Sequence, residues 1–369
     1  MLAKEVIRAT TNSILGHRES EFSDVLRHTT ELLKPVLGIN KTDQNYSTIF
    51  VSGSGTAANE TVLSSIGGLG RMLIISNGEF GERLLDLATI HYKNIDSLHF
   101  DWGKVIDLKL LDQQLKQKRY STVAVVHHET STGMLNPICE ITKIAHNRGA
   151  RIFVDAVSSI GAEKIQMSHT AIDVLVGTSG KALGAMPGVG IVVAKRKLME
   201  DLKNVQVRSH YLNLRNYHHY MESFEQTPNT PVVNVLMSLY AALSLIDRCG
   251  IDTYQKGIRH RAQITRGHLS RLHLPYRSYG KHTSSVLTCV DVPSWITYQH
   301  IADHFKAAGI VIYGGKGVYN NRIFQVGHIG ALTQANVRYS MRVLKQLADI
   351  PHSDYADTTL KEKQNAVHA

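Results

Sequence analysis

Short apolar runs alternate with segments of helical spacing from residue 21 to residue 196. Several of the runs are near-continuous in valine and isoleucine, which is typical of strands buried on both faces. Strands that alternate with helices predict a mostly parallel α/β sheet with helices on both sides. The expected strands are 46–54, 70–77, 97–102, 121–129, 150–158, 173–179 and 189–196, and the expected helices are 21–39, 56–69, 80–92, 108–118 and 139–149.

The pattern changes from about Pro231 onward. A long helical run over 232–249 leads into a second over 254–272, after which strands and helices mix. We therefore expect a large α/β domain over 1–235, whose N-terminal segment can pack with a small α+β domain over 236–350. The expected domains are followed by a polar tail over 351–369.

The composition argues against several classes of protein. No apolar run approaches the roughly 20 residues that cross a bilayer, and the N-terminus lacks the pattern of a signal peptide. The formal net charge is +10, but lysine and arginine are spread along the chain, so we expect no nucleic-acid partner. Cys139, Cys249 and Cys289 are too scattered for a disulfide framework or a zinc site. We expect them to be small, partly buried hydrophobes in a cytoplasmic protein.

The segment SGSGTAANE (52–60) connects an expected strand to an expected helix. It satisfies the G-x-G-x-x-A dinucleotide pattern, and Glu79 lies where a ribose-binding acid would be. The free N–H groups of a helix start suit any phosphate, with the hydroxyls of Ser54 and Thr56 beside them. A dinucleotide, another phosphate and a turn without a ligand all remain open on this segment alone.

Two further residues decide between these readings. Asp155 ends an apolar strand, where it either needs a cationic partner or caps the next turn. Lys181 follows 26 residues later, among small residues between two apolar strands. It is either an ordinary surface lysine or a buried one with a lowered pKa, suited to nucleophilic work. A phosphate-binding helix start, a carboxylate and a lysine together are what pyridoxal phosphate requires.

The residues also carry a family resemblance, through blocks that stand in family order along most of the chain. The blocks are GHRESEF, SGSGTAANE, NGEFGER, HHETSTGMLNPI, VDAVSSIGA, TSGKALGAMPGVG, YLNLRNY, FEQTPNTP and GIVIYGGKG. The chain resembles the class-V, fold-type-I aminotransferases that depend on pyridoxal phosphate, nearest to the 2-aminoethylphosphonate–pyruvate and alanine–glyoxylate enzymes. This implies transfer of an amino group from a small donor, 2-aminoethylphosphonate for example, to a small keto acid such as pyruvate.

The resemblance implies a role for each matching residue. Lys181 is the lysine that forms the Schiff base and then shuttles a proton, and Asp155 is the partner of the pyridinium nitrogen. Thr227 reaches the phosphate of the neighbouring subunit, which implies a homodimer with active sites at its interface. The other cofactor-binding residues implied are Ser54, Gly55 and Thr56 at the phosphate, Phe80 and Val157 on the two ring faces, Thr130 near the 3′-oxygen, and Ser179. Phe80 has a second reading as an ordinary core aromatic.

The sequence departs from the family pattern at three places. Gly180 stands where relatives often carry Gln or Asn, and no Gly-Pro entry segment precedes GHRESEF. Gln325 replaces the arginine that clamps a substrate carboxylate, and Arg322 would substitute only if its strand were rearranged. The runner-up within the family is an alanine/serine–glyoxylate-type transaminase. Gln325 leaves a third possibility open, which is a lyase that depends on pyridoxal phosphate or an aminotransferase whose donor lacks a carboxylate.

Readings from other classes are a nicotinamide dehydrogenase and a catalytically silent binding protein. A metal site at the adjacent His127, His128 and Glu129 is not expected, because consecutive strand residues point to opposite faces.

Overall fold

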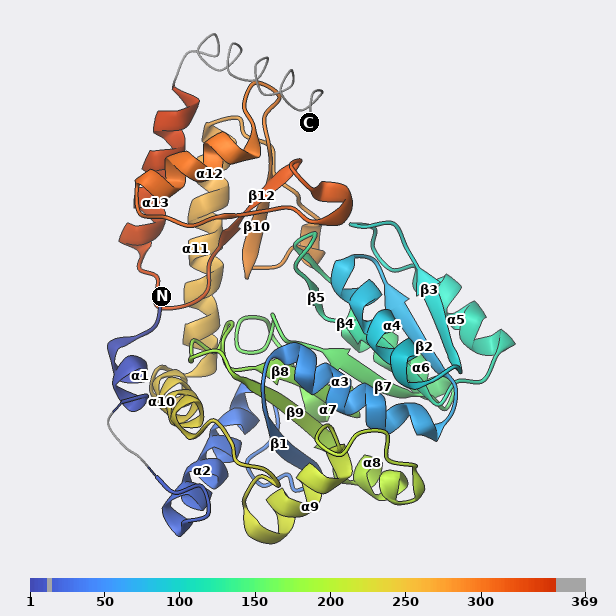
Figure 1. The fold of residues 1–369 in the computed structure, drawn as a ribbon. Helices are drawn as coiled ribbons and strands as arrows, with labels where there is room; N and C mark the ends of the chain where they lie inside the picture. The colour runs from blue at the N-terminus through green and yellow to red at the C-terminus, as the bar shows by residue number, and fades with distance from the viewer. Residues whose placement is uncertain (12–14, 350–369) are drawn as a thin grey trace, which may run out of the picture.

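A seven-stranded sheet forms the centre of the large domain in the computed structural model, which describes residues 1–11 and 15–349 (Figure 1). Its order is β1 (Tyr46–Ser52), β9 (Val189–Lys195), β8 (Val174–Thr178), β7 (Arg151–Asp155), β4 (Thr122–Val126), β2 (Met72–Ser76) and β3 (Ile95–His99). The five strands from β8 to β3 are mutually parallel, and β9 runs against both of its neighbours. Strands β2, β4 and β8 are buried throughout, as their unbroken apolar sequences predict.

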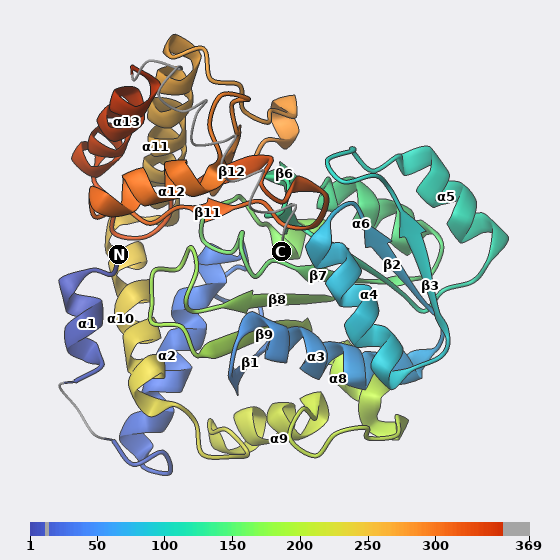
Figure 2. The same cartoon turned by 45° about the horizontal axis from the view of Figure 1, so that its top comes forward.

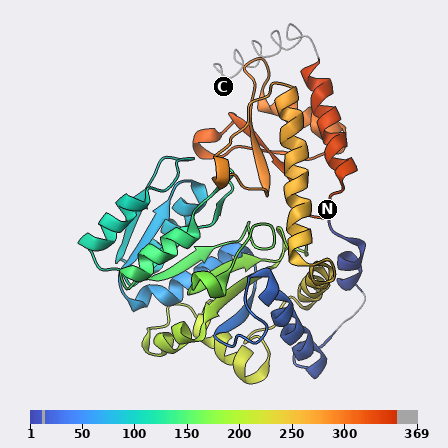
Figure 3. The same ribbon diagram turned by 180° about the vertical axis from the view of Figure 1, so that it is seen from behind.

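Helices cover both faces of this sheet, as Figures 1 and 3 show. On one face lie α3 (Gly55–Ile66) and α4 (Glu79–His91), and on the other α5 (Leu108–Gln117) and α6 (Ile138–Asn147). The apolar stripe of each helix packs on the sheet in one continuous core. The predicted fold class, a mostly parallel sheet with helices on both sides, is confirmed.

Several elements of the large domain escaped the sequence pattern. The expected strand 121–129 is broken at His127, because β5 (His128–Glu129) leaves the sheet to pair with β6 (Met134–Leu135). Short helices also lack a long apolar period. These are α1 (Lys4–Ala9), α7 (Met167–Thr170), α8 (Arg196–Asp201), α9 (Leu214–Phe224), and the 3₁₀ turns η1 (Gly67–Leu69) and η2 (Leu202–Asn204).

A three-stranded antiparallel sheet forms the small domain, in the order β10 (Leu287–Asp291), β12 (Ile323–Gly327), β11 (Tyr313–Gly314). A second apolar cluster fills the space between this sheet and its helices. The helices are α11 (Ile251–Arg271), α12 (Tyr298–Ala307) and α13 (Gln334–Ala348), with the 3₁₀ turns η3 (Gly280–His282) and η4 (Gly317–Tyr319). Figure 2 shows β11 and β12 facing the edge of the large sheet.

The two domains meet at the bend between α10 (Val233–Cys249) and α11, where the helix axes turn by 92°. The buried side chains of α10 belong to the large core, beside α1 and α2 (Ser20–Val36). We propose that the small domain begins near Gly250, since this packing favours a later division than the predicted 235/236. The predicted tail lies outside the described residues.

Two smaller expectations meet the described structure here. Cys289 is buried, whereas Cys139 and Cys249 are exposed, so the prediction of three partly buried cysteines is wrong for the latter two. They fall at the start of α6 and the end of α10, on the outward sides of these helices. Within the described part of the chain, no single helix is long and apolar enough to span a bilayer, although α10 and α11 together meet that test as a bent pair.

Candidate active site

The parallel direction of β1, β2, β4, β7 and β8 brings their carboxyl ends to one edge of the sheet. Each of the segments singled out in the sequence follows one of these ends, so the topology gathers residues that are far apart in the chain. The gathered residues are Ser54, Gly55 and Thr56 after β1, Phe80 after β2, Thr130 after β4, Asp155 and Val157 at β7, and Ser179 and Lys181 after β8.

Lys181 lies in the turn that follows β8 and lines a cavity at this edge. Of the two readings left open by the sequence, a surface lysine and a buried one, the structure shows a side chain that is exposed to this cavity. The neighbouring residues are small, as the sequence suggested, but the space they leave is open. Surrounding protein still lowers the pKa of Lys181, chiefly by desolvation and secondarily through the charge of Lys316. Both effects favour the neutral amine that nucleophilic attack requires.

Asp155 is buried at the end of β7, with 5% of its surface exposed. Its Oδ2 accepts a hydrogen bond of 2.6 Å from Nδ2 of Asn59, and its Oδ1 accepts one of 2.8 Å from the N–H of Val157. Burial raises the pKa of Asp155, opposed by these hydrogen bonds and more weakly by the charges of Arg83 and Lys181. A cation placed beside it would favour ionisation, as the pyridinium nitrogen of pyridoxal phosphate does.

The N-terminus of α3 has the form of a phosphate site. Its first turn presents backbone N–H groups that have no acceptor inside the helix, and Ser54 lies exposed at its N-cap. A glycine is required at position 55, at the carboxyl edge of the sheet, since an added Cβ would lie 2.6 Å from Cγ2 of Val157. Gly53 has a φ of +142°, which favours glycine.

Gly180 is explained by the backbone on the other side of the Lys181 turn. A Cβ at Gly180 would lie 2.6 Å from Cα of Pro187, so the larger residues of relatives would not fit this conformation. Beside it, Oγ of Ser179 donates to the carbonyl of Met186 at 2.7 Å and accepts from the N–H of Val189 at 3.2 Å. Ser179 thus shapes the turn that carries Lys181, and its predicted contact with the cofactor stays a prediction.

Glu129 holds the start of α4, which carries Phe80, and sequence reasoning missed this role. Its Oε2 accepts hydrogen bonds of 3.1 Å from the N–H groups of Phe80 and Gly81 at the start of α4, and its Oε1 accepts from Oγ of Ser131 at 2.6 Å. Gly78 makes room, since a Cβ there would lie 2.4 Å from Cγ of Glu129. Burial raises the pKa of this carboxyl to about 7, although the hydrogen bonds oppose the shift.

This pKa predicts a pH-dependent stability that Glu129→Gln removes. The folded chain holds the proton between about pH 4.5 and about pH 7, so the contribution of Glu129 is full below that window and is lost as the pH rises through it. The stability of the parent relative to Glu129→Gln should therefore fall across the window, by roughly 3 kcal/mol at most. Urea unfolding of both proteins at about pH 5 and about pH 8 measures this. An unchanged difference between the two pH values contradicts it.

The cavity has a volume of about 430 Å³ and lies between the two domains. Gln325 on β12 crosses this space, because its Nε2 donates to the carbonyl of Thr130 at 2.6 Å. Its amide N–H is therefore engaged with the protein. The described residues that line the cavity are Phe80, Thr130, Ser131, Ser158, Lys181, Val286, Leu287, Tyr313, Gly314, Lys316, Gln325, Gly327 and Ile329.

The predicted site residues that line this cavity are Phe80, Thr130, Lys181 and Gln325, whereas Arg322, Thr227 and the residues at the phosphate and the ring nitrogen are outside its lining. Arg322 is exposed in the turn that precedes β12, and it does not line the cavity that Gln325 lines. Thr227 is buried in the loop before α10, where its Oγ1 donates to the carbonyl of Asn229 at 2.8 Å. Its assignment to the phosphate of a neighbouring subunit stays a prediction.

Two further features were weighed in the sequence, which are Glu79 and the run His127, His128 and Glu129. Glu79, the candidate ribose-binding acid, forms ion pairs with Arg83 at 2.6 Å and Lys316 at 3.3 Å. These partners give it a structural role without a dinucleotide. For His127, His128 and Glu129, the described residues form no cluster of three or more metal-ligating side chains.

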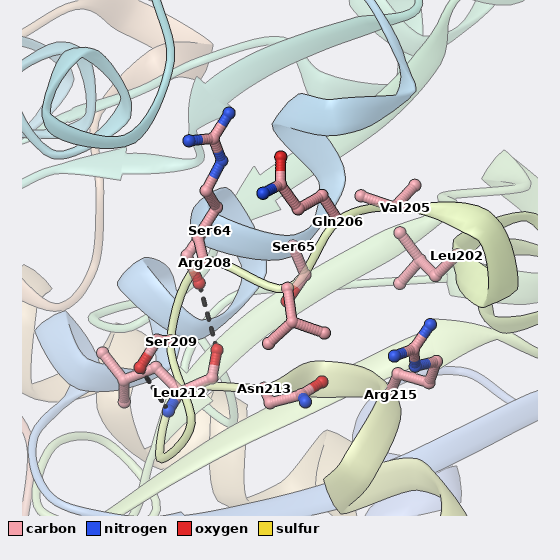
Figure 4. A pocket seen from close by; sticks show the side chains of 11 residues that line it. Ser64, Ser65, Leu202, Val205, Gln206, Arg208, Ser209, Leu212, Asn213 and Arg215 are labelled. Atoms are coloured by element: carbon pink, nitrogen blue, oxygen red, sulfur yellow. Dashed lines mark hydrogen bonds between the residues drawn. The ribbon is translucent and has the colours of Figure 1, made fainter.

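A separate pocket under the loop after α8 is too small to be a ligand site (Figure 4). It holds about 10 Å³, which is room for about one water molecule. The figure shows Oγ of Ser64 donating to the carbonyl of Leu212, and Oγ of Ser209 accepting from the N–H of Leu212. These bonds fix the loop against α3.

The residues present fit pyridoxal phosphate. The helix start at Gly55 suits its phosphate, Asp155 its ring nitrogen, and Lys181 its aldehyde carbon. His128 also has unsatisfied polar atoms, since both of its ring nitrogens are buried and have no hydrogen-bond partner among the described residues. Asn59 and Glu129, which support Asp155 and Phe80, could have been found only from the fold, because no local pattern marks them.

A lysine that lines a cavity, with a buried carboxylate and a helix start at the same edge of the sheet, defines on this topology a fold-type-I enzyme that depends on pyridoxal phosphate. The chain belongs to the class-V aminotransferases, whose family model matches residues 5–352. Its membership of this family, together with relatives that are named as transaminases, shows that the chain is a transaminase.

Several known proteins are similar along most of the chain. An uncharacterised aminotransferase of Methanocaldococcus jannaschii is 32% identical over 91% of this chain and 87% of its own length. A 2-aminoethylphosphonate–pyruvate transaminase of Bacillus cytotoxicus is 27% identical over 86% and 88%. The crystal structure of an alanine–glyoxylate aminotransferase from Nostoc sp. superposes with a TM-score of 0.88 at 26% identity, over 94% and 92%.

Proposed function

We propose that this transaminase takes its amino group from a small donor with an anionic group at the far end, 2-aminoethylphosphonate first, and passes it to a small keto acid such as pyruvate. The observation that carries the proposal is the charge of the cavity. Among the described residues that line it, the charged side chains are Lys181 and Lys316, and both are cationic. A similar protein named 2-aminoethylphosphonate–pyruvate transaminase supports the same donor.

The chain's own residues would divide the reaction as follows. Bound pyridoxal phosphate supplies an electron sink next to the donor's amino group. Asp155, held by Asn59 and the N–H of Val157, keeps a negative charge at the ring nitrogen. Phe80, fixed through Glu129, covers a ring face, and Nζ of Lys181 takes a proton from Cα of the donor and returns it on the cofactor side.

A panel of donors tests the proposal. We expect 2-aminoethylphosphonate to give the highest kcat/KM with pyruvate as acceptor. Serine with pyruvate or glyoxylate, and alanine with glyoxylate, should give lower values. The readouts by chromatography are alanine from pyruvate, glycine from glyoxylate, and the aldehyde or keto acid left by each donor (phosphonoacetaldehyde from 2-aminoethylphosphonate), with donor-free and cofactor-free controls. Clear turnover of alanine or serine with glyoxylate, and none of 2-aminoethylphosphonate, would sink the proposal in favour of an alanine/serine–glyoxylate enzyme. Elimination products without amino transfer would favour a lyase.

We also propose a homodimer, as the family resemblance implies, in the cytoplasm. Next to the loop that carries Thr227, the side chain of Phe224 is 53% exposed and Tyr211 is 42% exposed. Large exposed aromatic side chains of this kind are typical of surfaces that a partner covers. Arg18 donates to the carbonyl of Thr227 at 2.8 Å and so fixes the loop for a contact with a second copy.

A further inference from the structure

Lys316 stands in the loop between β11 and η4, across the cavity from the strand ends. Its side chain is 58% exposed, and its Nζ lies 5.7 Å from the centre of the Phe80 ring. Lys316 therefore lies near the ring of Phe80, which is expected to contact the cofactor, and it lines the same cavity as Lys181. The far end of a bound donor would lie beside Lys316, between the two domains.

The backbone around Lys316 is fixed even though its side chain is exposed. A Cβ at Gly315 would lie 2.2 Å from the carbonyl oxygen of Tyr319, and one at Gly317 would lie 2.5 Å from the Trp102 ring. The hydroxyl of Tyr319 donates to the carbonyl of Trp102 at 3.0 Å, which ties the loop to the large domain. Close packing therefore fixes the backbone of Lys316, and the ammonium group moves only through rotation of the side chain.

The charge of Lys316 is incompletely matched by the protein. Its partner is Oε1 of Glu79 at 3.3 Å, and the same oxygen accepts a hydrogen bond of 2.6 Å from Arg83. An exposed pair of this kind is weak, so an anionic ligand can compete for Lys316 at little cost. The excess positive charge also reaches Lys181, whose pKa it lowers. Gln325, by contrast, carries no charge, and its amide N–H is taken by Thr130.

We propose that Lys316 is a specificity-determining residue, whose ammonium group pairs with the phosphonate of the amino donor while the donor's amine reacts near Lys181. This inference rests on the proposed function and names the residue that selects its substrate. An ammonium is a point charge that binds phosphonate oxygens without the planar geometry a carboxylate clamp requires. Lys316 therefore accounts for a donor without a carboxylate and for a cavity without the clamping arginine.

Binding of ethylphosphonate to the holoenzyme tests this without turnover. Ethylphosphonate carries the anion but no amine, and pyridoxal phosphate already fills the helix start at Gly55, so the probe is left with the cavity. By calorimetry, we expect Lys316→Gln to weaken its binding about tenfold, and Lys316→Arg to keep most of the affinity. Lys345→Gln, the same charge change on the exposed side of α13, should leave binding unchanged. Added salt should weaken binding to the parent more than to Lys316→Gln.

The outcomes separate this inference from the proposed function. Equal affinity of the parent and Lys316→Gln for ethylphosphonate overturns the role of Lys316, even if the parent turns over 2-aminoethylphosphonate. Equal weakening by Lys345→Gln also overturns it, because the effect would then be general. With 2-aminoethylphosphonate as donor, we expect Lys316→Gln to raise KM about tenfold and to leave kcat within about twofold. Absence of turnover of 2-aminoethylphosphonate by the parent contradicts the proposed function. In that case, loss of ethylphosphonate binding in Lys316→Gln would still support the anion site.

Discussion

Replacement of Lys181 by alanine is expected to abolish transamination, with a loss of more than about a thousandfold. Lys181 is the lysine that the topology brings to the carboxyl edge of the sheet, in a cavity where its pKa is lowered. The variant loses both the nucleophile that holds the cofactor and the base that moves the proton. Added primary amines should restore part of the proton transfer but not the covalent attachment.

The covalent attachment is read from absorption, because a lysine-bound cofactor gives a visible band that borohydride removes. We expect the parent to show this band and Lys181→Ala to lack it after incubation with pyridoxal phosphate. Lys197→Ala, an exposed lysine on α8, is the matched control and should keep both band and activity. A borohydride-sensitive band of parental intensity in Lys181→Ala would show that another lysine holds the cofactor.

Replacement of Asp155 by asparagine is expected to reduce turnover roughly a hundredfold or more. The amide has nearly the same shape, but it places no negative charge at the ring nitrogen. The cofactor-free variant should be as stable as the parent or more stable, because burial disfavours the charged carboxylate and raises the pKa of Asp155. The cofactor should then stabilise the variant less than it stabilises the parent.

Thermal unfolding with and without pyridoxal phosphate measures both effects. Asp173→Asn is the matched control, since Asp173 is also buried beside the sheet but pairs with Lys195 at 2.9 Å and with His146 at 2.8 Å. That variant should lose stability in both forms and keep its response to the cofactor. Equal gains in Tm from the cofactor in Asp155→Asn and the parent would contradict the pairing.

Much of the fold was readable from the sequence because the apolar strands are buried on both faces and their pattern is unbroken. The strand β5 was not readable, since its change of partner depends on the hairpin with β6 and not on its own residues. The short helix α9 was missed for a similar reason, because its single apolar face packs on β1 from far along the chain.

The candidate site divides in the same way. Local sequence patterns were enough to identify the helix start at Gly55, Asp155 and Lys181, because glycines and charged residues stand at the ends of apolar strands. Glu129 acts through hydrogen bonds to Phe80, and only the approach of β5 to α4 brings the two together. The openness around Lys181 also depends on how the small domain sits over the strand ends, which no local pattern encodes.

Gln325, which the family resemblance places at the position of an arginine, contributes a neutral amide to the cavity. Its Nε2 hydrogen bond to Thr130 joins the small domain to the loop after β5, so the residue serves as a bridge. The positive charge of the cavity comes instead from Lys316 on the neighbouring loop. The cavity therefore has two cationic side chains, Lys181 and Lys316, without an arginine at position 325.

The central claim is that the bound cofactor accepts an amino group from a donor with an anionic far end. Its most direct test is a single half-reaction, in which holoenzyme is mixed with 2-aminoethylphosphonate in the absence of any keto acid. We predict that the visible band disappears faster with this donor than with alanine at equal concentration, and that pyruvate restores it. An unchanged band with 2-aminoethylphosphonate, together with a rapid loss with alanine, would contradict the account.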